Sequence, residues 1–172
     1  TLATSSAASD VYKRQEQTVA SKDDVTGEDV DIKGLTVDGF EAELKGNLTD
    51  KFSLVAGFTA MDGETSSGGE PREIPDQMLT LYGTYEISDK AGIAFGFTKQ
   101  GESNIKNNKP DLILPSYTRF DMAAYYNISD DLVLRFNVEN LTDELYFPHS
   151  HSTHQASVGE EKNVRVSISK KF

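Results

Sequence analysis

The sequence predicts an all-β protein, an antiparallel up-and-down meander of about seven strands that forms a fragment of a transmembrane β-barrel. Three observations support this fold class. Apolar and polar residues alternate with a period of two along most of the chain, which is typical of strands. The connections between these stretches are short and long in strict alternation. One of the two faces that the alternation defines carries full charges, and the other is apolar.

The composition limits the class of protein further. The chain has 172 residues, a formal net charge of -11, and neither cysteine nor tryptophan. This length suits one domain or one piece of a larger one. The acidity argues against a nucleic-acid partner, and the lack of cysteine excludes disulfides. No apolar stretch approaches the roughly 20 residues of a membrane helix, so an integral membrane element of this protein would consist of strands.

The N-terminal region divides into two parts that we exclude from the barrel. Residues 1–15 (TLATSSAASDVYKRQ) have no apolar periodicity, and they resemble a translated sequencing-adapter tail. We therefore expect a non-native or disordered tail there. Residues 16–33 are acidic and aperiodic, so they are expected to be the remnant of an extracellular loop.

The first four strands follow from Gly34 onward. The segment Leu35–Gly46 alternates between apolar Phe40, Ala42 and Leu44 and charged Glu41, Glu43 and Lys45. The short hinge NLTDK leads from it into the strand Phe52–Met61. After a long connection, the strand Gln77–Ile87 is joined by the hinge SDKA to the strand Gly92–Gly101. Each pair is expected to form a β-hairpin.

The last three strands repeat this arrangement. Tyr117–Ile128 and Leu132–Asn140 are joined by the hinge SDD, and Asn163–Phe172 follows a long connection. The segments LTDKFSLVAGFTAMD, ISDKAGIAFGFTKQG and ISDDLVLRFNVEN echo one another, since each begins a strand after a Ser/Thr-Asp turn. All five prolines lie in the long connections, where they remove no hydrogen bond from the sheet.

Alternation alone leaves two environments open for the apolar face. A soluble sandwich or barrel would bury this face, whereas a membrane barrel would turn it toward lipid and keep the charges in an aqueous lumen. Strands of about 10 residues, turns that are short at one rim and long at the other, and aromatic residues near strand ends favour the membrane barrel. We therefore expect the odd-numbered charged side to face inward and the even-numbered side to face lipid.

Several motifs, in order, resemble a known family. They are GFEAELKGNLTDKFSLVAGFTAMDGE, MLTLYGTYEI, LPSYTRFDMAAYYNISDDLVLRFNVENLTDELYF and the terminal NVRVSISKKF. Together they resemble the C-terminal part of the β-barrel of TonB-dependent outer-membrane receptors, in the siderophore-receptor branch. The resemblance covers residues 34–172.

This resemblance implies a function and a set of partners. The whole protein would be an integral importer in the outer membrane of a Gram-negative bacterium. It would take up a ferric siderophore with energy relayed by the TonB-ExbB-ExbD complex, and no covalently bound cofactor is implied. The signal peptide, the plug domain and the TonB box are not among these residues, so we expect the chain to be a fragment that transports nothing by itself.

The C-terminal residues resemble the signal by which outer-membrane barrels are recognised by their assembly machinery. Phe172 is the last residue, and Val164, Val166 and Ile168 precede it at a spacing of two. Lys170 departs from the pattern, because an aromatic or aliphatic residue is more usual there. A lysine near the rim can extend its amine toward water.

Candidate ligand contacts are expected in the long loops and the upper lumen. Tyr146 and Phe147 could stack on a ligand or belong to an interfacial aromatic girdle. His149, His151 and His154 are all the histidines of the chain, and they could bind a transition metal or belong to a flexible loop that binds none. Arg119 and Arg135 could meet an anionic ferric complex or pair with carboxylates in the barrel.

Two further functions remain as alternatives, a soluble β-sandwich or barrel that acts as a binding module, and a passive porin-like barrel of the outer membrane. An enzyme is not expected. Ser150 and Ser152 lie between histidines but have no nucleophile elbow and no orienting carboxylate.

Overall fold

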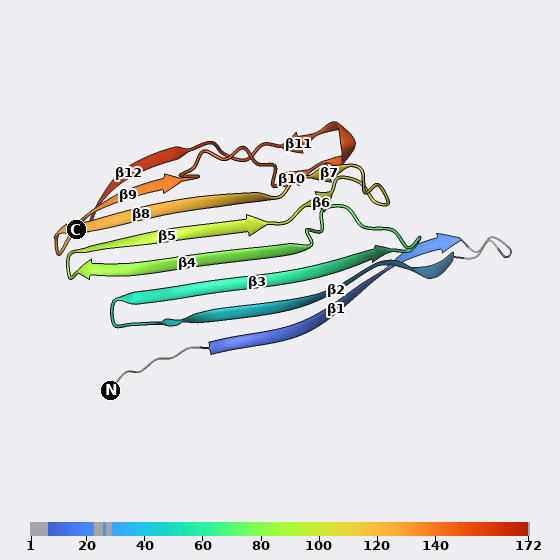
Figure 1. Cartoon of the computed structure of the whole chain (residues 1–172), viewed down its shortest axis with the longest axis horizontal. Coiled ribbons are helices and arrows are strands. Elements are labelled where there is room, and N and C mark those ends of the chain that lie inside the picture. Colours follow the sequence, from blue (N-terminus) through green and yellow to red (C-terminus); the bar gives the residue numbers. More distant parts are fainter. Residues whose placement is uncertain (1–6, 23–25, 27–28, 172) are drawn as a thin grey trace.

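One antiparallel sheet of eight strands dominates the structure, a computed structural model that describes residues 7–22, 26 and 29–171 (Figure 1). Strands that are neighbours in this sheet follow one another along the chain, so the predicted up-and-down meander is confirmed. The strands, in their order in the sheet, are β1 (Ala7–Lys22), β2 (Asp29–Asn47), β3 (Phe52–Thr65), β4 (Gln77–Ser88), β5 (Ala91–Gln100), β8 (Tyr117–Ser129), β9 (Leu132–Glu139) and β12 (Asn163–Lys170).

The three short hinges are turns closed by side-chain hydroxyl groups. The Thr49 hydroxyl accepts hydrogen bonds from the backbone N–H groups of Lys51 (3.2 Å) and Phe52 (3.0 Å). The Ser88 hydroxyl accepts one from Lys90 N–H at 3.3 Å. At the third hinge, the Ser129 hydroxyl donates to the Asp131 carboxylate at 2.6 Å. The hydroxyl groups of Thr49 and Ser88 satisfy the backbone locally in this way, which explains why Ser and Thr mark the turns.

The long connections contain small elements that the sequence did not predict. Between β5 and β8, β6 (Ser103–Asn104) pairs with β7 (Ile113–Leu114). Between β9 and β12, β10 (His149–Ser150) pairs with β11 (Ala156–Ser157), and a 3₁₀ turn, η1 (Ser152–His154), joins them. All of these elements lie toward one end of the sheet (Figure 1).

The N-terminal prediction was wrong in its secondary structure. Residues 7–22 form β1, which pairs with β2 from Ala7 opposite Lys45 to Lys22 opposite Asp29. Of the predicted loop over residues 16–33, residues 16–22 lie in β1 and residues 29–33 lie in β2. A strand at the edge of a sheet is held by backbone hydrogen bonds, which do not require apolar alternation. Residues 1–6 lie outside the described part, and the non-native origin of residues 1–15 stays a prediction.

The register of the sheet determines which residues share a face, because directly paired residues point to the same side. Phe40 pairs with Ala60, and Phe58 pairs with Leu79. Leu79 is odd-numbered, so the prediction that even numbers are apolar throughout was wrong for β4 and β5. The residues of the apolar face have even numbers in β2 and β3 and odd numbers in β4 and β5. They have even numbers again from β8 onward, since Phe97 pairs with Phe120. The local alternation within β4 and β5 already has its apolar residues at odd positions, such as Leu79, Leu81 and Phe97, so the error lay in extending one numbering to every strand.

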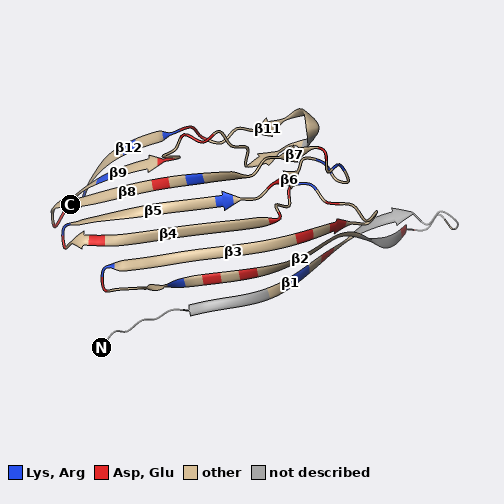
Figure 2. Cartoon of the chain, viewed as in Figure 1, with Lys and Arg blue, Asp and Glu red and all other residues tan. Residues whose placement is uncertain are grey.

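The apolar face is continuous across the sheet, although its residues change from even to odd numbers and back. In sheet order it carries Phe40, Ala42 and Leu44, then Leu54, Ala56 and Phe58, then Leu79, Leu81 and Tyr85, then Ile93, Phe95 and Phe97, then Phe120, Met122 and Tyr126, then Leu134, Phe136 and Val138, and finally Val164, Val166 and Ile168. The opposite face carries Glu41, Glu43 and Lys45 on β2, Arg119 and Asp121 on β8, and Arg135 and Glu139 on β9. Figure 2 shows that β3, β4 and β5 carry charges only near their ends.

The apolar face is not covered by a second layer within the described residues. Large side chains on it are strongly exposed, with 44% for Met122, 60% for Val166 and 66% for Ile168. A soluble sandwich would bury such a face against a second sheet, so the described part of the chain does not have the architecture of that alternative. Among the described residues, no helix is both long enough and apolar enough to cross a membrane.

A glycine on the charged face allows a close ring contact between β5 and β8. Gly92 pairs with Tyr125, and a Cβ at Gly92 would lie 2.4 Å from Cε1 of the tyrosine ring. We expect Gly92→Ala to destabilise the folded full-length protein by about 1–3 kcal/mol, because the ring must leave its position. Gly96→Ala is the matched control on the same face of β5, where the nearest atom is Asp121 Cβ at 3.3 Å.

The measurement is the free energy of unfolding for each variant, with the pair repeated in a Tyr125→Ala background. Removal of the ring should abolish most of the difference between Gly92→Ala and Gly96→Ala. Equal losses for the two glycine variants in the presence of Tyr125 would contradict the proposed role of the ring.

Candidate functional site

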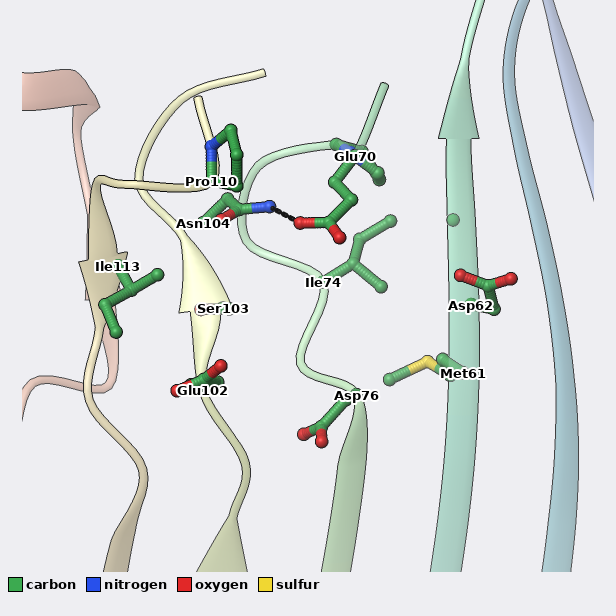
Figure 3. A pocket seen from close by; sticks show the side chains of 12 residues that line it. Met61, Asp62, Glu70, Ile74, Asp76, Glu102, Ser103, Asn104, Pro110 and Ile113 are labelled. Atoms are coloured by element: carbon green, nitrogen blue, oxygen red, sulfur yellow. Dashed lines mark hydrogen bonds between the residues drawn. The ribbon is translucent and has the colours of Figure 1, made fainter. Parts of the chain in front are cut away.

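The three long connections meet at one rim of the sheet, where the first two are joined by asparagine side chains. Asn104 Nδ2 donates to Glu70 Oε2 at 2.7 Å (Figure 3), and Asn108 Nδ2 donates to the Ser67 hydroxyl at 2.9 Å. The Thr65 hydroxyl in turn donates to Asn108 Oδ1 at 2.7 Å. These contacts hold residues 66–76 and 101–116 together as one unit.

The third connection contacts this unit through its small hairpin. The backbone N–H of Ser150, in β10, donates to Glu73 Oε1 at 2.9 Å, across 77 positions of the sequence. Ser150 is 5% exposed, so the contact is enclosed by protein. The described parts of all three long connections are thus linked by hydrogen bonds at this rim.

A second set of contacts fixes the base of the third connection. We define the loop-base network as Arg119, Asp121, Asn140 and Tyr146. Arg119 Nε and Nη2 donate to Asp121 Oδ2 at 3.2 and 2.9 Å, and Arg119 Nη1 donates to the Tyr146 hydroxyl at 3.1 Å. The other oxygen of Asp121, Oδ1, accepts the backbone N–H of Asn140 at 2.8 Å. The network therefore connects β8 with the loop that follows β9.

Asn140 is the most enclosed member of this network, with 1% exposure. Its Nδ2 donates to the carbonyl oxygens of Glu144 (2.9 Å) and Glu160 (3.0 Å), and its Oδ1 accepts the Glu144 N–H at 2.9 Å. Its φ of +50° lies in the left-handed region, which asparagine tolerates better than most residues. One side chain thus holds together the two ends of the loop.

The structure gives Tyr146 and Arg119 internal partners. The Tyr146 ring is 6% exposed and lies 4.6 Å from the Tyr117 ring, measured between centroids. Arg119 is paired with Asp121, as the structural alternative for the lumenal arginines predicts. Phe147 is half-buried. Contact of these residues with a ligand stays a prediction.

Arg135 lies apart from this rim, toward the short hinges. It is in the first half of β9, and its Nη1 donates to the Ser169 hydroxyl of β12 at 3.2 Å. The structure therefore does not bring Arg135 together with Arg119, although both lie on the charged face.

The three histidines lie in the hairpin of the third loop and are exposed. The rings of His151 and His154 are 5.5 Å apart between centroids, at 74° to each other. Over residues 7–22, 26 and 29–171, no three His, Cys, Asp or Glu side chains are grouped so that they could hold a metal ion. The described structure thus offers no support for a metal site of these histidines.

The sequence does not indicate the residues that organise this rim. Its patterns do not mark Glu73, Asn104 or Asn108, and they place Asn140 only at the end of a strand. The positive φ values of Glu73 (57°), Asn108 (56°) and Asn140 (50°) indicate turns. Asparagine-rich loops that contain proline were the only signal in the sequence, and such loops do not specify which segments meet.

The fold and this rim define a class of protein. In this class, a sheet with one uncovered apolar face carries long loops at one end, and hydrogen bonds join these loops to one another. A family model described as "TonB dependent receptor-like, beta-barrel" matches residues 12–141. The chain therefore belongs to the TonB-dependent receptor family and is a segment of its β-barrel.

Individual relatives agree with this assignment. The siderophore receptor PiuA of Acinetobacter baumannii is 28% identical over 155 residues, which cover 79% of this chain and 20% of the receptor. The ferrioxamine B receptor of Salmonella typhimurium is 27% identical over an alignment of 177 positions, which covers 94% of this chain and 25% of that receptor. The chain thus spans about a fifth to a quarter of these relatives.

Solved structures show the same fold. The crystal structure of PiuA superposes with a TM-score of 0.82 at 26% identity, over 97% of this chain and 26% of that one. The ferripyoverdine receptor of Pseudomonas aeruginosa, bound to ferripyoverdine, superposes with a TM-score of 0.80 at 26% identity, over 97% of this chain and 25% of that one. The predicted fold class, a fragment of a transmembrane β-barrel, is therefore confirmed.

Proposed function

We propose that this chain is the C-terminal part of the barrel of an outer-membrane receptor that binds and imports a ferric siderophore. The observation that carries the proposal is the superposition of 97% of the chain on the receptor bound to ferripyoverdine. The names of the sequence relatives, a siderophore receptor and a ferrioxamine B receptor, support the same ligand class.

The arrangement of the sheet supports an assignment of its two faces to two environments, the lipid and the lumen. The continuous apolar face would contact the acyl chains of the outer membrane, and the charged face would line the lumen. The rim of long, bonded loops would then face the outside of the cell, where a ligand arrives. Energy for import would come from the TonB-ExbB-ExbD complex through a part of the receptor outside this chain.

Two apolar residues of β12 support the proposal that the outer-membrane assembly machinery recognises this part of the chain. Val166 and Ile168 project from the apolar face of β12, which is an edge strand within the described sheet. Lys170 pairs with Leu132 beside the short hinge, and the Lys171 N–H donates to the Asp131 carbonyl at 2.9 Å. Phe172, the last residue of the predicted signal, lies outside the described residues.

The test is iron uptake by the complete receptor. The full reading frame would be recovered from its source DNA and expressed in a Gram-negative strain that lacks its own siderophore receptors. We expect accumulation of radioactive iron from at least one of three ferric complexes, a catecholate, a hydroxamate or a pyoverdine type, and we expect it to stop when TonB is deleted. Uptake of none of the three by a folded receptor in the outer membrane would contradict the proposal. Uptake that does not depend on TonB would instead favour a passive barrel.

A further inference from the structure

One lysine interrupts the apolar face where β5 ends. Lys99 pairs with Leu79 on β4 and with Thr118 on β8, and directly paired residues point to the same side of a sheet. Lys99 therefore shares the apolar face with Leu79. Among the paired residues that the structure describes on β4, β5, β8 and β9, it is the single charged residue on this face. Figure 2 shows a positive charge at the loop end of β5.

The length of β5 places Lys99 at the edge of the hydrocarbon layer. This strand has 10 residues, Ala91–Gln100. At about 3.3 Å per residue, a strand of this length extends over about 33 Å. A tilt of about 40° reduces its height to about 25 Å, which is the height of the apolar band of a membrane barrel. Lys99 is the last residue but one of the strand, so it lies just inside the loop-side edge of the band, next to the phosphate groups of the lipid headgroups.

The amine of Lys99 has no anionic partner among the residues that the structure describes. The side chain is exposed, and none of the ion pairs of the described residues includes it. Its paired neighbours, Leu79 and Thr118, are uncharged. A charged amine at the boundary of hydrocarbon is costly unless it reaches water or an anion, and the long stem of lysine can extend toward the headgroups. The amine is thus free to meet an anion that belongs to the membrane.

The residues around Lys99 have the same order of polar and apolar groups as a lipid. Thr118, directly opposite Lys99, is half-buried and adds a hydroxyl donor. Two residues nearer the middle of the sheet, Phe97 and Phe120 are paired, and their ring centroids are 5.2 Å apart at an angle of 64° between the rings. Phe120 is 41% exposed, so its ring is open to an acyl chain. Two hydrogen-bond donors thus lie beside the headgroup level, and two aromatic rings lie beside the acyl chains.

The charge on the rest of this face restricts an anion to the neighbourhood of β5. Toward the loops, β2 and β3 carry Asp38 and Asp62 on the same face, paired with each other. These carboxylates repel a phosphate group. The described residues of β4 and β8 present no carboxylate on the apolar face, because those that pair with β5 there are uncharged. An anionic headgroup is therefore attracted to Lys99 and kept away from β2 and β3.

We propose that Lys99 and Thr118 bind the phosphate group of an anionic lipid in the leaflet on the loop side of the membrane, while Phe97 and Phe120 contact its acyl chain. This inference rests on the proposed contact of the apolar face with lipid, and it adds the chemistry of the headgroup and the residues that bind it. A phosphate group accepts hydrogen bonds from both an ammonium and a hydroxyl group, and the charged bond is the stronger. Lys99 is therefore the main determinant of the site.

The test is photo-crosslinking of lipids to the full-length receptor in phosphatidylcholine vesicles. Each preparation contains a trace of one probe lipid, either a phosphatidate or a phosphatidylcholine, with the same photoreactive group in the acyl chain close to the headgroup. Mass spectrometry quantifies the crosslinks at Phe97 and Phe120 relative to those at Phe136, whose paired neighbours on this face are Ala124 and Val166. We expect the phosphatidate probe to label Phe97 and Phe120 about fivefold more than the phosphatidylcholine probe does, because the lysine attracts the anionic headgroup.

Four variants identify the groups that cause this preference. Lys99→Gln should abolish most of it, and Lys99→Arg should keep it, because arginine also carries a positive charge and binds phosphate. Thr118→Val keeps the branched shape without the hydroxyl and should reduce the preference about twofold. Lys90→Gln is the matched control, since Lys90 is an exposed lysine in the short hinge at the other end of β5, and it should leave the preference unchanged.

The outcomes separate this inference from the proposed function. Equal labelling by the two probes in the wild type, or a preference that survives Lys99→Gln, would overturn the headgroup site and leave the lipid contact of the sheet intact. If neither probe labelled the apolar face, the lipid contact itself would fail, and the headgroup site with it. Inorganic phosphate in solution should not remove the preference, because it lacks the acyl chain. Removal of the preference by inorganic phosphate would indicate a site for soluble anions and would also overturn the proposal.

Discussion

Leu81→Arg is expected to destabilise the folded receptor in a membrane by about 2–4 kcal/mol. Leu81 lies on the apolar face, between Ala56 on β3 and Phe97 on β5, near the middle of the band of apolar residues. If this face contacts lipid, the arginine must be placed near the bilayer midplane, where the cost for Arg or Lys has this size. The measurement is the free energy of unfolding of the complete receptor from phospholipid vesicles.

Thr80→Arg is the matched control, because it introduces the same side chain one residue away on the opposite face. Thr80 pairs with Gly57 and Thr98, neither of which is charged. In an aqueous lumen this arginine stays hydrated, so we expect the free energy of unfolding to change by no more than about 0.5 kcal/mol. If Thr80→Arg were the more damaging substitution, the assignment of the two faces would be reversed. Equal and small effects of both would contradict a lipid-facing sheet.

Asn140→Ala is expected to release the loop that connects β9 and β12. The substitution removes three hydrogen bonds of a side chain that is 1% exposed. At about 1 kcal/mol each, this loss amounts to about 3 kcal/mol. The left-handed φ of +50° adds about 1–2 kcal/mol for alanine. Asn140→Gly removes the same bonds without the backbone cost, so it should be less damaging than Asn140→Ala.

Hydrogen exchange of residues 141–162 in the complete receptor measures this effect. A loss of about 3 kcal/mol corresponds to exchange that is faster by two orders of magnitude or more, and the increase should be confined to this loop. Asn163→Ala is the control, since Asn163 is an exposed residue at the start of β12. Unchanged exchange in Asn140→Ala would mean that other contacts hold the loop.

The predicted site was recovered only in part, and particular residues show why. The sequence placed Tyr146, Phe147 and the three histidines in one loop, and the structure agrees. The sequence did not indicate that Tyr146 would be enclosed by Tyr117 and Arg119. It also did not indicate that Ser150 would meet Glu73 across 77 positions. A loop without periodicity contains no signal for its distant partner, whereas a strand indicates its neighbour through a short turn.

The sequence by itself determined seven of the eight strands of the sheet, the three tight hinges and the existence of two chemically different faces. These features depend on the two-residue period of an extended chain and on Ser, Thr and Asp at turns, which act over a few neighbouring residues. Only the tertiary structure decided the pairing of β1 with β2, the loop-base network and the joining of the three long connections at one rim. Each of these depends on the distance and register between segments that lie far apart in the chain, and these are set when the sheet brings the segments together.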